Sequence, residues 1–175
     1  MSTSYQSWKE LTVKTQTFGG SHGDTKLFDD LEYAKSVFND DELPRIVKVE
    51  IYTDYQLAYG YRFFYSNNRT APKHWGCHAK ASVITYTYDF EPGEYIAKVF
   101  GRTGGICDQL SFITNTGRKM IGGGNGGGLG DTKIPDGCAV VGVGGGVGGH
   151  IHHYFAHYVD LSKISPIVKE RFLNG

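Results

Sequence analysis

Short segments in which apolar and polar residues alternate recur along most of this chain, and clusters of turn residues separate them. In one of them, Val47, Val49 and Ile51 alternate with two charged residues. A period of two is typical of strands with one buried face, and frequent turns between such strands are typical of a sandwich, barrel or prism. The segments with this pattern are 11–18, 47–51, 59–65, 84–88, 95–100, 110–114, 140–143 and 151–159. The chain is therefore predicted to be all-β.

Glycine is the outlier in composition, and it is clustered. The chain has 25 glycines in 175 residues, or about 14%, roughly twice the average usage of about 7%. Most of the excess lies between the alternating segments, so these glycines are interpreted as turns and not as a flexible linker. Twelve Tyr and ten Phe residues fit the same picture, because aromatic side chains favour pleated, half-buried surfaces.

Length and charge limit the classes of function. A chain of 175 residues fits one domain. The formal net charge is zero and Lys and Arg are scattered, so no nucleic-acid partner is predicted. No apolar run approaches the ~18 residues of a membrane helix, and no secretory leader is recognisable at the start. The compartment is left open between the cytoplasm and release without a signal.

Two segments do not follow the strand pattern. Residues 27–41 are acidic and mixed, and only a short helical turn is suggested there. Residues 161–173 have the composition of a helix, which Pro166 is expected to limit.

Catalytic signatures are missing from the sequence. The glycines of 122–133 are not followed by Gly-Lys-Ser/Thr, as a phosphate-binding loop requires. The three cysteines, Cys77, Cys107 and Cys138, form no Cys-x-x-Cys pair, and their odd number favours free thiols. The chain is therefore predicted not to be an enzyme, and no cofactor is expected.

A glycine pair followed by three residues and a strand occurs twice. Residues 104–108 read GGICD, and residues 148–152 read GGHIH. Repetition of a turn-and-strand unit suggests a β architecture with rotational symmetry.

Five motifs then resemble those of the jacalin-related lectin family, in the order and spacing of that family. They are FGGSHG (18–23), FEPGEYIAKVFG (90–101), LSFITNTGR (110–118), GGGNGGG (122–128) and VVGVGGGVGG (140–149). The resemblance implies a β-prism of three four-stranded Greek-key sheets with pseudo-threefold symmetry over residues 10–160, with 161–175 as a tail. It also implies metal-independent binding of mannose, glucose or galactose at loops on one end, and glycans or glycoproteins as partners.

The resemblance assigns one site to the turn of Gly104, Gly105, Ile106, Cys107 and Asp108. Asp108 would accept two sugar hydroxyls, the N–H groups of Ile106 and Cys107 would donate, and the loop containing Gly123, Gly124 and Asn125 would close the site. The chemistry is suitable, because a carboxylate accepts hydroxyls strongly and glycine allows close approach of the backbone. The alternative is that Asp108 only caps a turn.

A second site would join Gly19 and Gly20 to the last turn, which contains Gly149, His150 and His152. Here the aspartate position falls on a histidine, which offers fewer acceptor sites than a carboxylate. Zinc binding by the histidines is a further alternative, with His22 as an additional ligand. The favoured interpretation has no metal, with His153 and His157 inward and the other two histidines exposed.

The remaining alternatives concern the whole domain. A third turn, 53–57, carries Leu57 where an aspartate is expected, and residues 67–81 contain no glycine pair, so this position is expected to be vacant. A prism without its standard aspartate could instead be a protein-interaction or assembly module. Homo-oligomer formation is left open.

Overall fold

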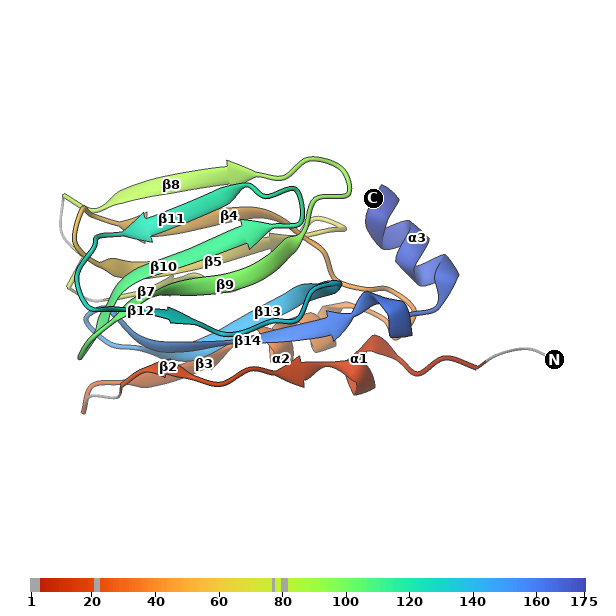
Figure 1. Cartoon of the computed structure of the whole chain (residues 1–175), viewed down its shortest axis with the longest axis horizontal. Coiled ribbons are helices and arrows are strands. Elements are labelled where there is room, and N and C mark those ends of the chain that lie inside the picture. The colour runs from red at the N-terminus through yellow and green to blue at the C-terminus, as the bar shows by residue number, and fades with distance from the viewer. Residues whose placement is uncertain (1–3, 21–22, 77, 80–81) are drawn as a thin grey trace.

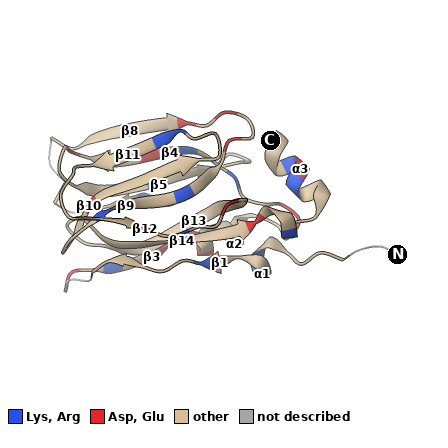
Figure 2. Ribbon diagram, viewed as in Figure 1, with Lys and Arg blue, Asp and Glu red and all other residues tan. Residues whose placement is uncertain are grey.

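The structure is a computed structural model that describes residues 4–20, 23–76, 78–79 and 82–175. The described residues form three antiparallel sheets around a common core (Figure 1). Charged residues of both signs are interspersed over the described ribbon (Figure 2). None of the described helices is long and apolar enough to cross a membrane.

The central sheet shows the repeating topology most simply. It contains β9 (Ile96–Thr103), β10 (Cys107–Thr114), β11 (Lys119–Gly123) and β12 (Gly128–Asp131), in the spatial order β11-β10-β9-β12. Three consecutive antiparallel strands are thus followed by a fourth that returns beside the first, which is a Greek key.

The second sheet repeats this order with a broken edge. It contains β4 (Ile46–Thr53), β5 (Ala58–Tyr65), β6 (Arg69–Thr70), β7 (His74–Trp75) and β8 (Ile84–Asp89). Strands β6 and β7 both pair with β5, and β8 returns beside β4. The two short strands therefore occupy a single position at the edge of a four-position sheet.

The third sheet joins the two ends of the chain. Strands β13 (Cys138–Val147) and β14 (Ile151–Asp160) pair with each other, β1 (Val13–Lys14) and β2 (Phe18–Gly19) pair with β14, and β3 (Lys26–Asp29) pairs with β13. The Greek-key order appears again, with its last two positions supplied by the N-terminal segment. The prediction of three four-position Greek-key sheets is confirmed, with two edge strands broken.

Aromatic side chains fill the space between the sheets. Tyr61 and Phe63 of β5 are fully buried, and the Phe63 ring lies 5.7 Å from that of Phe112 on β10. These side chains occupy alternate positions of strands from different sheets, as the period-two pattern predicts. The core is therefore shared by all three sheets.

The helices correct three local predictions. The strand predicted for 11–18 exists only as β1 and β2, because helix α1 (Trp8–Leu11) extends to Leu11 and its Trp8 is buried. The unplaced segment 27–41 contains β3 and helix α2 (Asp30–Val37), which Asp29 caps through its side chain. In the tail, a turn of 3-10 helix, η1 (Leu161–Lys163), precedes helix α3 (Pro166–Asn174), so Pro166 begins the helix.

All the glycine-rich turns lie at one end of the molecule. The glycine-rich turns after β2, β9, β11 and β13 are at the left of Figure 1, beside the turn after β4, whereas α1, α3 and both termini are at the right. The fold thus presents the glycine-rich loops together, at the end opposite to α1 and α3.

Candidate functional site

The turn at 104–108 and the loop at 122–128 lie against each other, as predicted. The turn connects β9 to β10, and the Gly104 N–H donates to the Ile106 carbonyl at 3.0 Å. The Gly124 N–H donates to the Asp108 carbonyl, also at 3.0 Å. The loop after β11 is therefore fixed to the strand that carries Asp108.

The Asp108 carboxylate faces a different pair of glycines from the pair predicted. A Cβ on Gly126 would lie 2.7 Å from Asp108 Oδ1, and one on Gly127 would lie 2.5 Å from Oδ2. Gly124 instead packs on the backbone of Tyr55 and Gln56. Because glycine has no Cβ, the carboxylate can approach the loop backbone closely.

No side-chain hydrogen bond engages the Asp108 carboxylate within the described part of the chain, and the residue is half-exposed. A carboxylate offers about four acceptor positions. This arrangement provides a half-exposed acceptor beside a loop of small residues. Chemically, it can accept hydroxyl groups from a ligand.

The side chain of Cys107 faces away from this surface. It is fully buried, and its Sγ donates to the Gln109 carbonyl at 3.1 Å. Burial raises the pKa of this thiol well above its usual range, so it is not a nucleophile. Cys107 can reach a ligand only through its backbone. Cys107 and Cys138 are both free thiols, and Cys77 lies outside the described residues.

The glycine pair at Gly19 and Gly20 lies on the last turn, as predicted. Gly19 is opposite His153 in the β2–β14 ladder, and the Gly20 N–H donates to the His152 carbonyl at 3.2 Å. A Cβ on Gly19 would overlap the His152 carbonyl. Glycine is therefore required for this close pairing.

The prediction that His152 is exposed is wrong. Only 2% of His152 is accessible, and its Nδ1 lies 2.6 Å from Thr25 Oγ1. His153 and His157 are buried, as predicted. Their ring nitrogens lie 2.9 Å from the Gly20 carbonyl and from Asp29 Oδ1 respectively.

His150 lies at the rim of this turn and is half-buried. Its ring centroid is 5.2 Å from that of Tyr59 and 5.2 Å from that of His78. Burial lowers the pKa of His150, and the neighbouring His78 and His152 lower it further, so the ring is neutral at pH 7. In the described residues, no three His, Cys, Asp or Glu side chains are arranged to hold a metal ion. His22, the additional ligand considered, lies outside them.

The third turn has a carboxylate that is fully engaged. Asp54 accepts hydrogen bonds from the N–H groups of Gln56 and Leu57, at 2.7 and 2.8 Å, and from the Tyr59 hydroxyl at 2.9 Å. Its carboxylate therefore holds the turn and is poorly placed to take a ligand.

Comparison with known proteins decides the family. The profile of the jacalin-like lectin domain matches residues 15–155. The chain belongs to the jacalin-like lectin family. Members of this family are non-catalytic carbohydrate-binding proteins, so this jacalin-like domain is a carbohydrate-binding domain and not an enzyme, as predicted.

Solved structures confirm the β-prism fold. Recombinant single-chain jacalin is 19% identical, with a TM-score of 0.67, and the match covers 85% of this chain and 94% of that one. Artocarpin complexed with methyl-α-mannose is also 19% identical, with a TM-score of 0.67 and coverage of 85% and 98%. The mannose-binding lectin from Champedak is 22% identical, with a TM-score of 0.65 and coverage of 85% and 97%. No curated protein sequence matches the chain.

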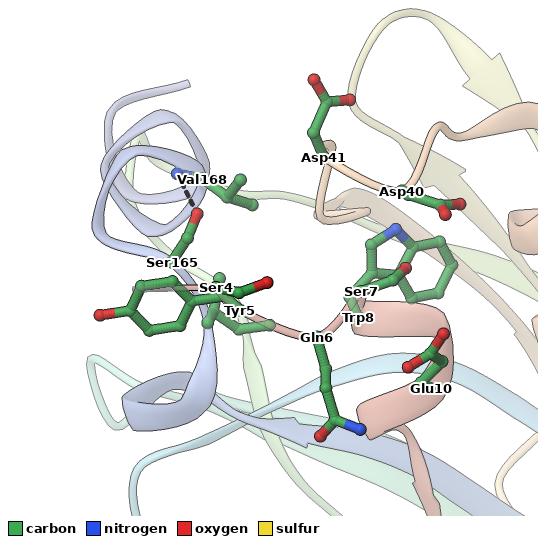
Figure 3. Close-up of a pocket in the computed structure, with 11 residues that line it drawn as sticks. Ser4, Tyr5, Gln6, Ser7, Trp8, Glu10, Asp40, Asp41, Ser165 and Val168 are labelled. Carbon is green, nitrogen blue, oxygen red and sulfur yellow. Dashed lines mark hydrogen bonds between the residues drawn. The ribbon is translucent and has the colours of Figure 1, made fainter. Parts of the chain in front are cut away.

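A hollow on this jacalin-like domain lies away from the glycine-rich turns. It measures about 660 Å³ and is formed by the segment before α1, the loop after α2 and the start of α3. Figure 3 shows Trp8, Asp40 and Asp41 around it, with the Ser165 hydroxyl accepting from the Val168 N–H. None of the predicted site residues lines it.

Sequence reasoning missed three candidate residues of the lectin loops. Gly126 and Gly127 face Asp108, whereas the sequence predicts Gly123 and Gly124 of the same run. Asp24 lies against Gly148 and Gly149 of the last turn. The run of glycines could have pointed to the first two, but nothing local to Asp24 indicates its distant partners.

Proposed function

We propose that this jacalin-like domain binds hexoses through the turn that carries Asp108. The supporting observation is the half-exposed Asp108 carboxylate beside Gly126 and Gly127, without a side-chain hydrogen bond in the described chain. Two adjacent sugar hydroxyls can donate to such a carboxylate in charge-assisted hydrogen bonds. The N–H groups of Ile106 and Cys107 are the proposed donors to the sugar.

A hexose of the mannose type is the first ligand to test. Artocarpin was solved with methyl-α-mannose, and the Champedak protein is described as mannose-binding. Millimolar affinity, about −4 kcal/mol, is expected for one small open site. Higher avidity would then require several sites or an oligomer.

The test combines a glycan array with a residue-resolved titration. The array establishes which glycans the wild-type chain binds. Methyl α-mannoside, methyl α-glucoside and methyl α-galactoside are then titrated while the amide shifts of residues 104–108 and 126–127 are followed. Asp108→Asn should weaken binding at this turn more than tenfold, because it removes the charge and one acceptor. The free energy of unfolding should change by less than about 0.5 kcal/mol.

Asp136→Asn is the matched control, because Asp136 has 99% of its side chain exposed in another loop. It should leave the titration unchanged. Binding at the turn that survives Asp108→Asn would refute the site assignment. The absence of any glycan signal would favour the protein-interaction alternative, as would a partner that high mannose or galactose does not release.

A further inference from the structure

Two aromatic rings meet on the outer face of the second sheet, away from the core. In β4, Val49 and Ile51 point into the core, so Tyr52 lies on the opposite face. The register places Tyr52 beside Gly60 of β5, and Gly60 beside Trp75 of β7. Because Gly60 has no side chain, the two rings can meet across it. Their centroids lie 5.0 Å apart and their planes are at 63°, so the rings of Tyr52 and Trp75 form an aromatic corner.

The ammonium group of Lys73 lies in this aromatic corner. Its Nζ is 4.6 Å from the Tyr52 centroid and 4.2 Å from the Trp75 centroid. The faces of aromatic rings attract cations, because their π electrons give these faces a negative potential. Within the described part of the chain, Lys73 forms no ion pair with a carboxylate. The corner is therefore a cation site whose occupant is a side chain of the protein itself.

The two walls of the corner are held differently. The Tyr52 hydroxyl donates to Glu50 Oε1 at 3.0 Å, which orients this ring and brings a negative charge next to it. A carboxylate at this distance favours a cation in the corner. The other wall, Trp75, is 42% exposed, so a ligand can reach it from solvent.

A quaternary ammonium group suits the corner better than a lysine does. The ammonium of lysine is compact and strongly hydrated, so water competes with the rings for it. A trimethylammonium group donates no hydrogen bond to water, and its methyl groups bury apolar surface against the rings. Lys73 is exposed and has a flexible stem, so such a group can displace it.

The displaced lysine would leave a positive charge beside the ligand. Lys73 is two residues before Trp75, so its ammonium stays within reach of a group next to the corner. Arg62, opposite Glu50 in the β4–β5 ladder, has a second positive charge on the same face. An anion joined to the quaternary ammonium by a short spacer can pair with these charges. Phosphocholine has this combination, with a phosphate two carbons from its trimethylammonium group.

We propose that the aromatic corner of Tyr52 and Trp75 binds a phosphocholine group. The trimethylammonium group replaces the Lys73 ammonium on the two rings, and the Lys73 ammonium moves to the phosphate. The site lies on the strands of the second sheet, its ligand is not a sugar, and it does not depend on the proposed hexose site at Asp108.

The experiment titrates the full chain with choline and with phosphocholine while the indole N–H and the amide of Trp75 are followed. The chain has two tryptophans, and Trp8 is buried, so Trp75 has the accessible indole. Both probes should give saturable shifts with millimolar affinity, as expected for a small open site. Phosphocholine should bind about threefold more tightly than choline, because only phosphocholine pairs with Lys73. The amides of residues 104–108 should not shift.

Lys73→Gln tests the two halves of the ligand separately. It removes the competing ammonium, so choline should bind about twofold more tightly. It also removes the partner of the phosphate, so the preference for phosphocholine should disappear. Lys48→Gln is the matched control, because Lys48 Nζ lies 4.6 Å from the single ring of Phe64 on the same face. Lys48→Gln should change neither affinity.

Trp75→Ala should abolish the binding of both probes, followed at the amides of Tyr52 and Gly60. Trp75→Phe keeps an aromatic wall and should weaken binding by less than about tenfold. Thermal melting checks the fold of each variant. If Trp75→Ala unfolds, Trp75→Phe and Lys73→Gln still test the site.

Vesicles of phosphatidylcholine distinguish two sources of the phosphocholine group. A chain that sediments with the vesicles and is released by free phosphocholine takes the group from a lipid surface. A chain that binds only free phosphocholine takes it from a soluble or polymer-linked molecule. Both results support the site.

Three results would overturn the proposal. The first is the absence of shifts at Trp75 with either probe up to about 50 mM, well above a millimolar Kd. The second is binding that Trp75→Ala leaves unchanged. The third is phosphocholine that binds no more tightly than choline, together with choline binding that Lys73→Gln does not strengthen. Hexose binding at the Asp108 turn is unaffected by any of them.

Discussion

Strand β9 has a carboxylate near each of its ends, and the two are held in opposite ways. At the end near α3, Glu94 is 2% exposed and fully engaged. It accepts hydrogen bonds from the Glu91 N–H at 3.0 Å, the Thr114 hydroxyl at 2.7 Å and the Thr116 hydroxyl at 2.9 Å. Arg118 adds a bidentate contact, with nitrogens 3.1 and 2.7 Å from the two carboxylate oxygens.

Asp108 sits at the other end, where the described side chains give its carboxylate no hydrogen bond and glycines leave it half-exposed. A buried carboxylate with all its acceptor positions used stabilises the fold and is inaccessible to a ligand. A half-exposed one beside glycines contributes little to stability but is available. Burial and the number of hydrogen bonds that a carboxylate accepts within the chain therefore matter more than its position in a turn. They distinguish an acidic residue that stabilises the fold from a candidate binding residue.

The largest effect is expected from Glu94→Gln. The substitution removes the charge that faces Arg118 and one acceptor that serves Thr114 and Thr116. Loss of one partner from a buried charged network costs about 3 kcal/mol. Urea denaturation should show this loss of unfolding free energy, while sugar titrations at residues 104–108 stay unchanged. Glu91→Gln is the control, because the Glu91 side chain is exposed. An equal loss of unfolding free energy in Glu91→Gln would show that the buried network of Glu94 has no special effect on stability.

The same carboxylate predicts how stability depends on pH. Burial alone would raise the pKa of Glu94, but its hydrogen bonds lower it from 4.5 to about 2. Because the folded-state pKa is depressed, the stabilisation is complete above pH 4.5 and is lost as the pH falls towards 2. The shift corresponds to about 3 kcal/mol. The difference in unfolding free energy between wild type and Glu94→Gln should shrink as the pH falls from 4.5 towards 2. A difference that stays constant over this range would contradict the low pKa of Glu94.

A smaller loss of stability is expected from Gly127→Ala at the glycine-rich end. Gly127 has a φ of +66°, and its new Cβ would lie 2.5 Å from Asp108 Oδ2. The strained backbone and the contact should lower the unfolding free energy by about 1–2 kcal/mol and abolish sugar shifts at this turn. Gly128→Ala, whose Cβ would be 3.9 Å from the nearest atom, should do neither. Equal effects of both variants on binding would show that the carboxylate does not define the site.

Much of the fold could be predicted because its signals are local. The alternation in β4, β5, β9 and β10 and the glycine pairs that end them are visible within a few residues. The segment 27–41 was not placed because its helix depends on contacts from elsewhere. Leu31 packs against Gly142, whose missing Cβ lets α2 approach β13. No sequence pattern near Leu31 indicates that Gly142 leaves this space.

The site was less predictable than the fold. The motif residues that carry the family resemblance, Glu94, Thr114 and Arg118, form the structural network at the far end of β9 and not the sugar turn. Asp24 and Gly149 are 125 positions apart, so their hydrogen bond exists only after the third sheet has formed. A search for an aspartate at a fixed spacing inspects one turn, whereas the carboxylate that contacts the last turn, Asp24, lies far from it in the sequence.

The closing of the third sheet by the two ends of the chain also sets an order of assembly during synthesis. Strands β1, β2 and β3 pair only with β13 and β14, so residues 13–29 leave the ribosome more than a hundred residues before their partners. The Asp108 turn and its glycine loop, by contrast, lie within residues 103–128 and can take shape as soon as β9 to β12 have emerged. Residues 13–29 are therefore a nascent segment with unpaired strand edges, exposed to chaperones and to pairing with neighbouring chains until translation is nearly complete.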